Sequence, residues 1–187
     1  MSAGQARSTH RCSMQDYEWK SMFTTPKPGA AEAEIAKVET HLGARFPDAM
    51  RQGLKAAKMA SVYKRGKICE LAVTGPFAEG GRIAGVMSYL EPLDRIEVET
   101  RDIVEYVFDI YDRSIPDVIA FAQLGGGGWT CLNYQNDPTR ANPEIWEANM
   151  ETNATFATFF HKVADSFDDF IDMLQSDDEI AALGFRV

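Results

Sequence analysis

Apolar residues recur at helical intervals in four separate parts of the chain. In the first part, Ile35 and Val38 share one face, and Gly43 supplies the stop at which many helices end. In the last part, Ser166 is followed three residues later by Asp169, a spacing typical of a capped helix start. The sequence therefore predicts helices over residues 30–42, 50–59, 103–111 and 167–174, with a short further helix after residue 176.

Two short apolar runs separated by glycines lie between the third and fourth predicted helices. Residues 118–122 and 129–134 are rich in β-branched and aromatic side chains, and four consecutive glycines occupy residues 125–128. This order is typical of two antiparallel strands joined by a turn. Because side chains alternate along a strand, we expect Trp129 and Tyr134 to face opposite sides of the sheet.

The four glycines also raise the alternative of a phosphate-binding loop, since glycine lets a backbone approach a phosphate closely. A P-loop requires Lys and then Ser or Thr after its last glycine, whereas Trp129 and Thr130 follow here. A dinucleotide-binding loop requires a helix after the glycines, and this sequence continues as a predicted strand. We therefore interpret the glycines as a turn that uses their positive φ angles.

Shorter apolar runs predict additional strands at residues 68–73, 83–90 and 144–146. Pro26 and Pro28 end an N-terminal segment, residues 1–28, that we interpret as an arm, and residues 29–187 then form the domain. The chain contains no internal repeat and no low-complexity linker. These elements predict a single α+β domain in which N-terminal helices and a C-terminal helix pack on a central antiparallel sheet.

Composition excludes several classes of protein. Hydrophobic residues make up 45% and charged residues 25% of the chain, as in ordinary globular proteins. There is neither an apolar run of the roughly 18 residues that a membrane-spanning helix needs nor the apolar core of a secretory signal, so we expect a cytoplasmic protein. Cys12, Cys69 and Cys131 are far apart and the three histidines are scattered, so we expect neither a metal site nor a cofactor.

Charge is distributed unevenly along the chain, whose net charge is −9. Residues 1–67 contain 12 Lys and Arg against 6 Asp and Glu, a net +6, whereas residues 68–187 contain 7 against 22, a net −15. The simpler interpretation is a solvated acidic surface that favours solubility. The alternative is a negative field that repels nucleic acid and attracts a basic partner.

Three segments occur in an order that is familiar from one superfamily. Residues 35–54, IAKVETHLGARFPDAMRQGL, contain a helix followed by the patterns E-x-x-L-G and F-P. Residues 115–134, IPDVIAFAQLGGGGWTCLNY, contain a strand, a glycine turn and a second strand. Residues 163–174, VADSFDDFIDML, form an acidic and aromatic terminal helix. Together they resemble the SUKH superfamily of Smi/Knr-type domains.

The resemblance implies a domain that works by binding and has no catalytic residues, so we expect no enzymatic activity. The superfamily includes bacterial immunity proteins, which bind and neutralise toxins, and fungal cell-wall regulators, which act as scaffolds. A nuclease toxin holds a polyanion and therefore presents a basic surface, which an acidic protein can cover. The leading hypothesis is an immunity protein that binds a basic, nuclease-type toxin but neither nucleic acid nor membrane. A regulatory scaffold of the same fold, without a toxin partner, is the alternative.

Aromatic and acidic residues in and after the predicted hairpin are candidates for contact with a partner. These candidates are Trp129, Tyr134, Asp137, Glu144, Trp146 and Glu147. For the three aromatic residues, ordinary core packing is the competing interpretation.

A second alternative is a small hydrolase that uses paired carboxylates. Asp109 with Asp112, and Asp165 with Asp168, are such pairs, and paired acids perform acid–base chemistry when their pKa values are shifted. The sequence contains no nucleophile motif and no paired Cys and His. Solvated carboxylates rarely indicate catalysis, so we favour the binding hypothesis.

Overall fold

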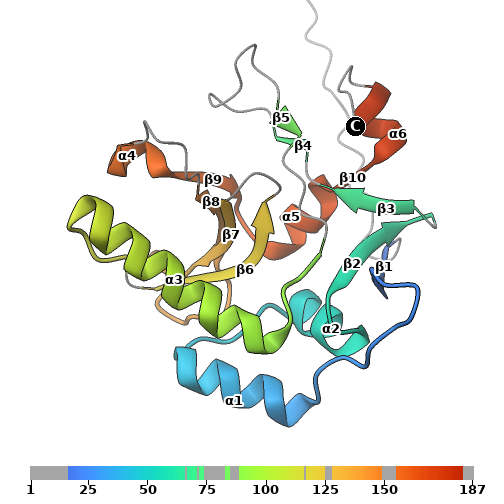
Figure 1. The fold of residues 1–187 in the computed structure, drawn as a ribbon, viewed down its shortest axis with the longest axis horizontal. Helices are drawn as coiled ribbons and strands as arrows, with labels where there is room; N and C mark the ends of the chain where they lie inside the picture. Colours follow the sequence, from blue (N-terminus) through green and yellow to red (C-terminus); the bar gives the residue numbers. More distant parts are fainter. Residues whose placement is uncertain are drawn as a thin grey trace, which may run out of the picture.

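The fold comes from a computed structural model that describes residues 17–65, 67–70, 72–73, 83–84, 89–115, 117–124, 128–148 and 155–182 (Figure 1). Its helices are α1 (Glu32–Leu42), α2 (Asp48–Ala56), α3 (Leu93–Tyr111), α4 (Phe156–Phe159), α5 (Phe167–Met173) and α6 (Asp177–Ala182). Its strands are β1 (Tyr17–Ser21), β2 (Ala60–Lys64), β3 (Lys67–Glu70), β4 (Ala72–Val73), β5 (Ile83–Ala84), β6 (Val118–Leu124), β7 (Gly128–Asn133), β8 (Glu144–Ala148), β9 (Phe160–Ala164) and β10 (Gln175–Ser176). The chain is a mixed α+β domain with antiparallel sheets, as the sequence predicted.

The predicted hairpin is the first half of a four-stranded antiparallel sheet in the order β6-β7-β8-β9. Val118 lies opposite Asn133 at one end of the hairpin, and Leu124 lies opposite Gly128 at the other. The predicted third strand is β8, which pairs with β7 and in turn with β9. The hairpin prediction is therefore confirmed.

Helices cover both faces of this sheet, and each face has its own hydrophobic core. On one face, Tyr134 packs in a cluster with side chains of α1, α2 and α5, including Phe170. On the other face, Trp129 packs with side chains of α3 and α4, including Ile103. The predicted alternation of Trp129 and Tyr134 is thus confirmed. In Figure 1, α3 runs across the front of the sheet and α4 lies beside its final turns.

A second sheet, in the order β1-β2-β3-β10, lies beside the first. Two consecutive residues connect the two sheets. The Leu90 amide donates to the Ala60 carbonyl at 2.8 Å, and the Glu91 amide donates to the Phe121 carbonyl at 2.9 Å. Ala60 belongs to β2 and Phe121 to β6, so this short segment is hydrogen-bonded to both sheets.

The helix ends follow the predicted capping residues. Gly43 ends α1 with a φ of 65°, the left-handed conformation that glycine adopts without strain. The Ser166 hydroxyl accepts a hydrogen bond from the Asp169 amide and caps α5. Helix α2 ends at Ala56, earlier than the predicted residue 59, because the chain is extended at Ala57.

Helix α3 is longer than predicted and differs on one face. It begins at Leu93, ten residues before the predicted start, and it buries Glu99, a polar residue that breaks the apolar pattern. The spacing of apolar residues in the sequence predicts one apolar face made of Ile103, Val104, Val107, Phe108 and Tyr111. The side chain of Phe108 is nevertheless 57% exposed. Five residues separate Phe108 from buried Ile103, and at 100° per residue that spacing turns Phe108 away from the sheet.

Some predictions lie outside the described residues. They are residues 1–16 of the predicted arm, residues 71 and 85–88 of two predicted strands, and the glycines at residues 125–127. The turns that glycine and proline predict at residues 74–76 and 80–81, and the end that Gly184 predicts for the last helix, also lie outside them. Within the described residues, none of the helices combines the length and the apolar character needed to cross a membrane.

Candidate partner-binding surface

Two of the six predicted contact residues lie in the interior. Trp129 is 8% exposed, and its indole N–H donates to Glu99 Oε2 at 2.8 Å. Tyr134 is 2% exposed, and its hydroxyl donates to the Arg45 carbonyl at 2.8 Å. Burial is the main reason why the pKa of Tyr134 is raised. Both side chains are therefore part of a hydrophobic core and have a hydrogen-bond partner for their polar group, as the core-packing interpretation expects.

Asp137 organises the loop between β7 and β8. Its carboxylate accepts hydrogen bonds from the backbone amides of Thr139 (2.9 Å), Ala141 (2.7 Å) and Asn142 (2.6 Å) and from the Thr139 hydroxyl (2.6 Å). These bonds, chiefly the one from the Thr139 hydroxyl, lower the pKa of Asp137 to about 2. Asp137 therefore fixes the shape of the loop that leads into β8.

Glu144 and Trp146 lie together on the face of the sheet that α3 and α4 cover. The indole N–H of Trp146 donates to Glu144 Oε2 at 3.0 Å, and Lys162 Nζ lies 2.6 Å from Glu144 Oε1. The hydrogen bond from Lys162 is the largest cause of the lowered pKa of Glu144. Both side chains are only partly buried, so a charged group and an aromatic ring reach the surface side by side.

Trp146 forms one wall of a hollow that we call the aromatic groove. Its apolar lining residues come from β6, β8, β9, α4 and the loop after α3, and its volume is about 300 Å³. They are Ile115, Val118, Trp146, Phe156, Ala157 and Phe160. The rings of Trp146 and Phe160 are 5.9 Å apart in an edge-on arrangement, and Phe156 is 39% exposed. Phe156 and Phe160 were not among the predicted contact residues, because no periodic pattern in the sequence places α4 and β9 beside β8.

Glu147 points to the other face of the sheet and is only 8% exposed. Thr130 and His161 lie opposite it on the neighbouring strands. Within the described part of the chain, neither Glu147 Oε1 nor Thr130 Oγ1 has a hydrogen-bond partner. Burial raises the pKa of Glu147 to about 7. Although adjacent in sequence to Trp146, Glu147 therefore belongs to the interior.

Two buried carboxylates, Glu91 just before α3 and Glu99 within it, were not identified by sequence reasoning. Burial and the neighbouring charge of Glu99 raise the pKa of Glu91. Burial alone would raise the pKa of Glu99, but hydrogen bonds, first that of Trp129, lower it overall, and Arg95 also pairs with this carboxylate. Glu99 thereby anchors Trp129 to α3. Among the described residues, no group of His, Cys, Asp or Glu has the arrangement of a metal site.

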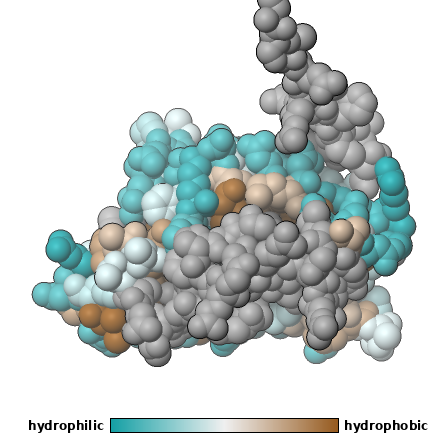
Figure 2. Space-filling view, turned by 90° about the horizontal axis from the view of Figure 1, so that it is seen from above, coloured by the Kyte–Doolittle hydropathy of each residue, from teal (hydrophilic) through white to brown (hydrophobic). Residues whose placement is uncertain are grey.

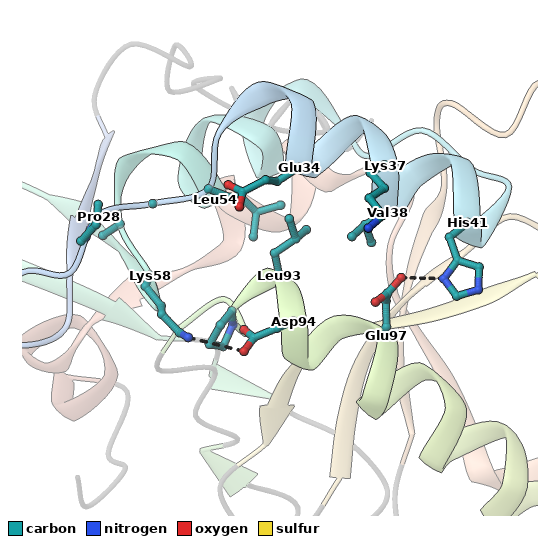
Figure 3. Close-up of a pocket in the computed structure, with 14 residues that line it drawn as sticks. Pro28, Glu34, Lys37, Val38, His41, Leu54, Lys58, Leu93, Asp94 and Glu97 are labelled. Atoms are coloured by element: carbon teal, nitrogen blue, oxygen red, sulfur yellow. Dashed lines mark hydrogen bonds and ion pairs between the residues drawn. The ribbon is translucent and has the colours of Figure 1, made fainter.

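A larger hollow of about 470 Å³ lies between α1 and the start of α3 (Figure 3). Its floor is apolar and includes Val38, Leu54, Ala57 and Leu93. One hydrogen bond and one ion pair bridge its rim: His41 Nδ1 lies 2.6 Å from Glu97 Oε1, and Lys58 Nζ lies 3.5 Å from Asp94 Oδ2. Because these polar groups of the rim already pair with each other, the hollow offers mainly apolar packing to a ligand.

These observations define a class of protein: a single α+β domain with helices on both faces of its main sheet and an aromatic groove at one end. The chain matches the profile of the SMI1 / KNR4 family (SUKH-1) over residues 29–173, most of its length, and it therefore belongs to that family. The match begins just before α1 and ends with α5, so β1 and α6 lie outside it. A search of curated proteins gave no match.

Proposed function

We propose that this protein is a non-catalytic immunity protein that binds and neutralises a cognate toxin. Membership of the SUKH-1 family carries the proposal, because this superfamily works by binding and includes immunity proteins as well as regulators. The net charge of −15 in residues 68–187 favours a toxin with a basic, nuclease-type surface. We place the protein in the cytoplasm, with a protein partner rather than nucleic acid or a membrane.

The aromatic groove and Glu144 form the contact surface in this proposal. Partly exposed aromatic rings next to a hollow are typical anchors of protein interfaces, where a few residues provide most of the affinity. Phe156 and Trp146 provide such rings, and Glu144 adds a negative charge at the rim. Trp129 belongs to the core on the same face of the sheet as the groove, whereas Tyr134 packs in the core on the opposite face.

Co-expression with the protein encoded immediately upstream tests the proposed function. We expect this neighbour to be retained by the tagged protein at 0.1 M NaCl and to lose its toxicity to the host cell in the presence of the protein. A toxic neighbour that is neither retained nor neutralised would contradict the immunity function. A non-toxic neighbour that is retained would instead favour the regulatory scaffold.

Glu144→Lys is expected to slow association with the retained partner by about three- to tenfold at low salt, because a charge at the rim of an interface acts mainly on encounter. Stopped-flow or surface-plasmon measurements of the association rate check this. The control is Asp172→Lys, an exposed residue on α5, which packs on the opposite face of the sheet. Equal slowing by both variants would mean that net charge, rather than this surface, governs association.

A further inference from the structure

The outward face of the last turns of α3 carries one exposed aromatic ring among carboxylates. We call this face the acidic ridge, and it consists of Glu105, Phe108, Asp109 and Asp112. All four are exposed, and the side chain of Phe108 is 57% exposed. Phe108 is one of only five large hydrophobic residues that are exposed in the described part of the chain. The exposed ring offers one apolar contact in the middle of a charged helix face.

The acidic ridge works against the stability of its own helix. The C-terminal end of a helix carries partial negative charge, so cations are favourable there and anions are not. The last turn of α3 contains no basic residue, and Asp109 and Asp112 lie at this end. In the described chain, no ion pair involves Asp109 or Asp112, whereas Arg101 lies 3.8 Å from Glu105. Asp112 ends α3 in the left-handed conformation, with a φ of 50°, which Asp adopts more readily than most residues. Both carboxylates are exposed, so a cation of a partner can approach them.

The acidic ridge is continuous with the aromatic groove. Tyr111 follows Phe108 by three residues, which places both on neighbouring positions of the helix surface. The ring of Tyr111 lies 5.9 Å from that of Phe156, which also lines the groove. Seen from above, the end of the molecule where α3 terminates has hydrophobic atoms beside hydrophilic ones (Figure 2). A partner in the groove therefore reaches the ridge without leaving the surface.

We propose that the acidic ridge receives a basic, amphipathic helix of the partner protein. Glu105, Phe108 and Asp112 are spaced by three and four residues, so they form one row along the helix. A second helix that packs along this row presents its own side chains with the same spacing. One apolar side chain of that helix packs on Phe108, and lysine or arginine side chains approach Asp109 and Asp112. The inference rests on the proposed function, in which the partner is a basic protein, and it names the partner's element and where it binds.

A defined peptide tests the ridge independently of the natural partner. The probe is a 14-residue amphipathic helix of leucine and lysine at heptad spacing, titrated at 50 mM NaCl, with a glutamate-for-lysine analogue as the reference. We expect the unaltered protein to bind the lysine peptide only. Asp109→Lys with Asp112→Lys should weaken this binding at least about tenfold.

Matched variants separate the ridge from general charge. Asp168→Lys with Asp172→Lys makes the same change in charge on α5, and it should weaken binding less than about twofold. Phe108→Ser should weaken binding about fivefold without lowering the Tm, since the ring is largely exposed. Equal weakening by the two charge-reversed pairs, or amide chemical-shift changes on α5 instead of α3, would overturn the inference.

The natural partner distinguishes failure of the ridge from failure of the proposed function. If the upstream-encoded protein is retained equally by the unaltered protein and by the Asp109→Lys, Asp112→Lys variant, the ridge inference is wrong and the proposed function stands. If the unaltered protein binds the lysine peptide through α3 but does not retain or neutralise a toxic neighbour, the proposed function is wrong and the ridge is a binding site for another basic protein.

Discussion

Replacing Phe170 by alanine is expected to lower the free energy of unfolding by about 3–5 kcal/mol, because it leaves a cavity in the main core. Phe170 is fully buried in α5, and its ring lies 5.9 Å from those of both Phe121 and Phe167. The loss therefore affects contacts with β6 and within α5 at once. Urea denaturation followed by circular dichroism measures the change as a shift of the midpoint at constant slope.

Asp172→Ala is the matched control on the same helix. Asp172 is exposed two residues after Phe170, and exposed substitutions usually change the free energy of unfolding by less than about 0.5 kcal/mol. If Phe170→Ala and Asp172→Ala lowered the free energy of unfolding by similar amounts, α5 would not pack on the sheet through the face that carries Phe170.

Glu147→Gln is expected to stabilise the protein at pH 8 by about 2–3 kcal/mol and to have little effect near pH 4.5. The ordinary pKa of 4.5 rises to about 7 in the folded state because the carboxyl group is buried. Between these values the folded state binds a proton that the unfolded state has released, so the contribution of Glu147 to stability falls as the pH rises. Above pH 7 the folded protein holds a buried charge, which glutamine removes.

Glu144→Gln should behave in the opposite way. Lys162 lowers the pKa of Glu144 in the folded state, so its charge stabilises the fold above pH 4.5 and this contribution is lost as the pH falls. The variant is expected to be less stable than the unaltered protein at pH 8, by no more than about 1 kcal/mol for a partly exposed pair. Urea midpoints measured for both variants at pH 4.5, 6 and 8 show how the effect of each substitution on stability changes with pH. A Glu147→Gln effect that is constant across this range would show that Glu147 does not titrate near pH 7.

Local signals explain why much of the fold could be predicted. Gly43 and Ser166 mark helix ends through backbone conformation and capping, which depend on neighbouring residues alone. The glycines between β6 and β7 marked the hairpin in the same way. By contrast, β9 and α4 were missed, because they are only five and four residues long and carry no clear periodic pattern.

The candidate site was harder to predict than the fold, because exposure depends on what packs above each strand. Alternation correctly separated the faces of the hairpin, but it could not show that Trp129 is covered by α3 while Trp146 remains partly open. Glu147 was chosen because it is next to Trp146 in sequence, although adjacent strand residues point to opposite faces. Glu99 was not recognised because a buried carboxylate bonded to an indole N–H has no local sequence pattern.

The strand β1 has a consequence for any shortened form of the chain. It pairs with β2 along its whole length, from Tyr17 opposite Lys64 to Ser21 opposite Ala60, yet it lies before the region shared with the family. The ring of Trp19 lies so close to Gly53 that a methyl group there would come within 2.8 Å of it. A fragment beginning at residue 29 has a bare hydrogen-bonding edge on β2 above an uncovered patch of α2. Bare strand edges template pairing between molecules, so the family-sized fragment is expected to form aggregates. In the longer chain the edge strand is β1, whose charged residues Glu18 and Lys20 disfavour such pairing.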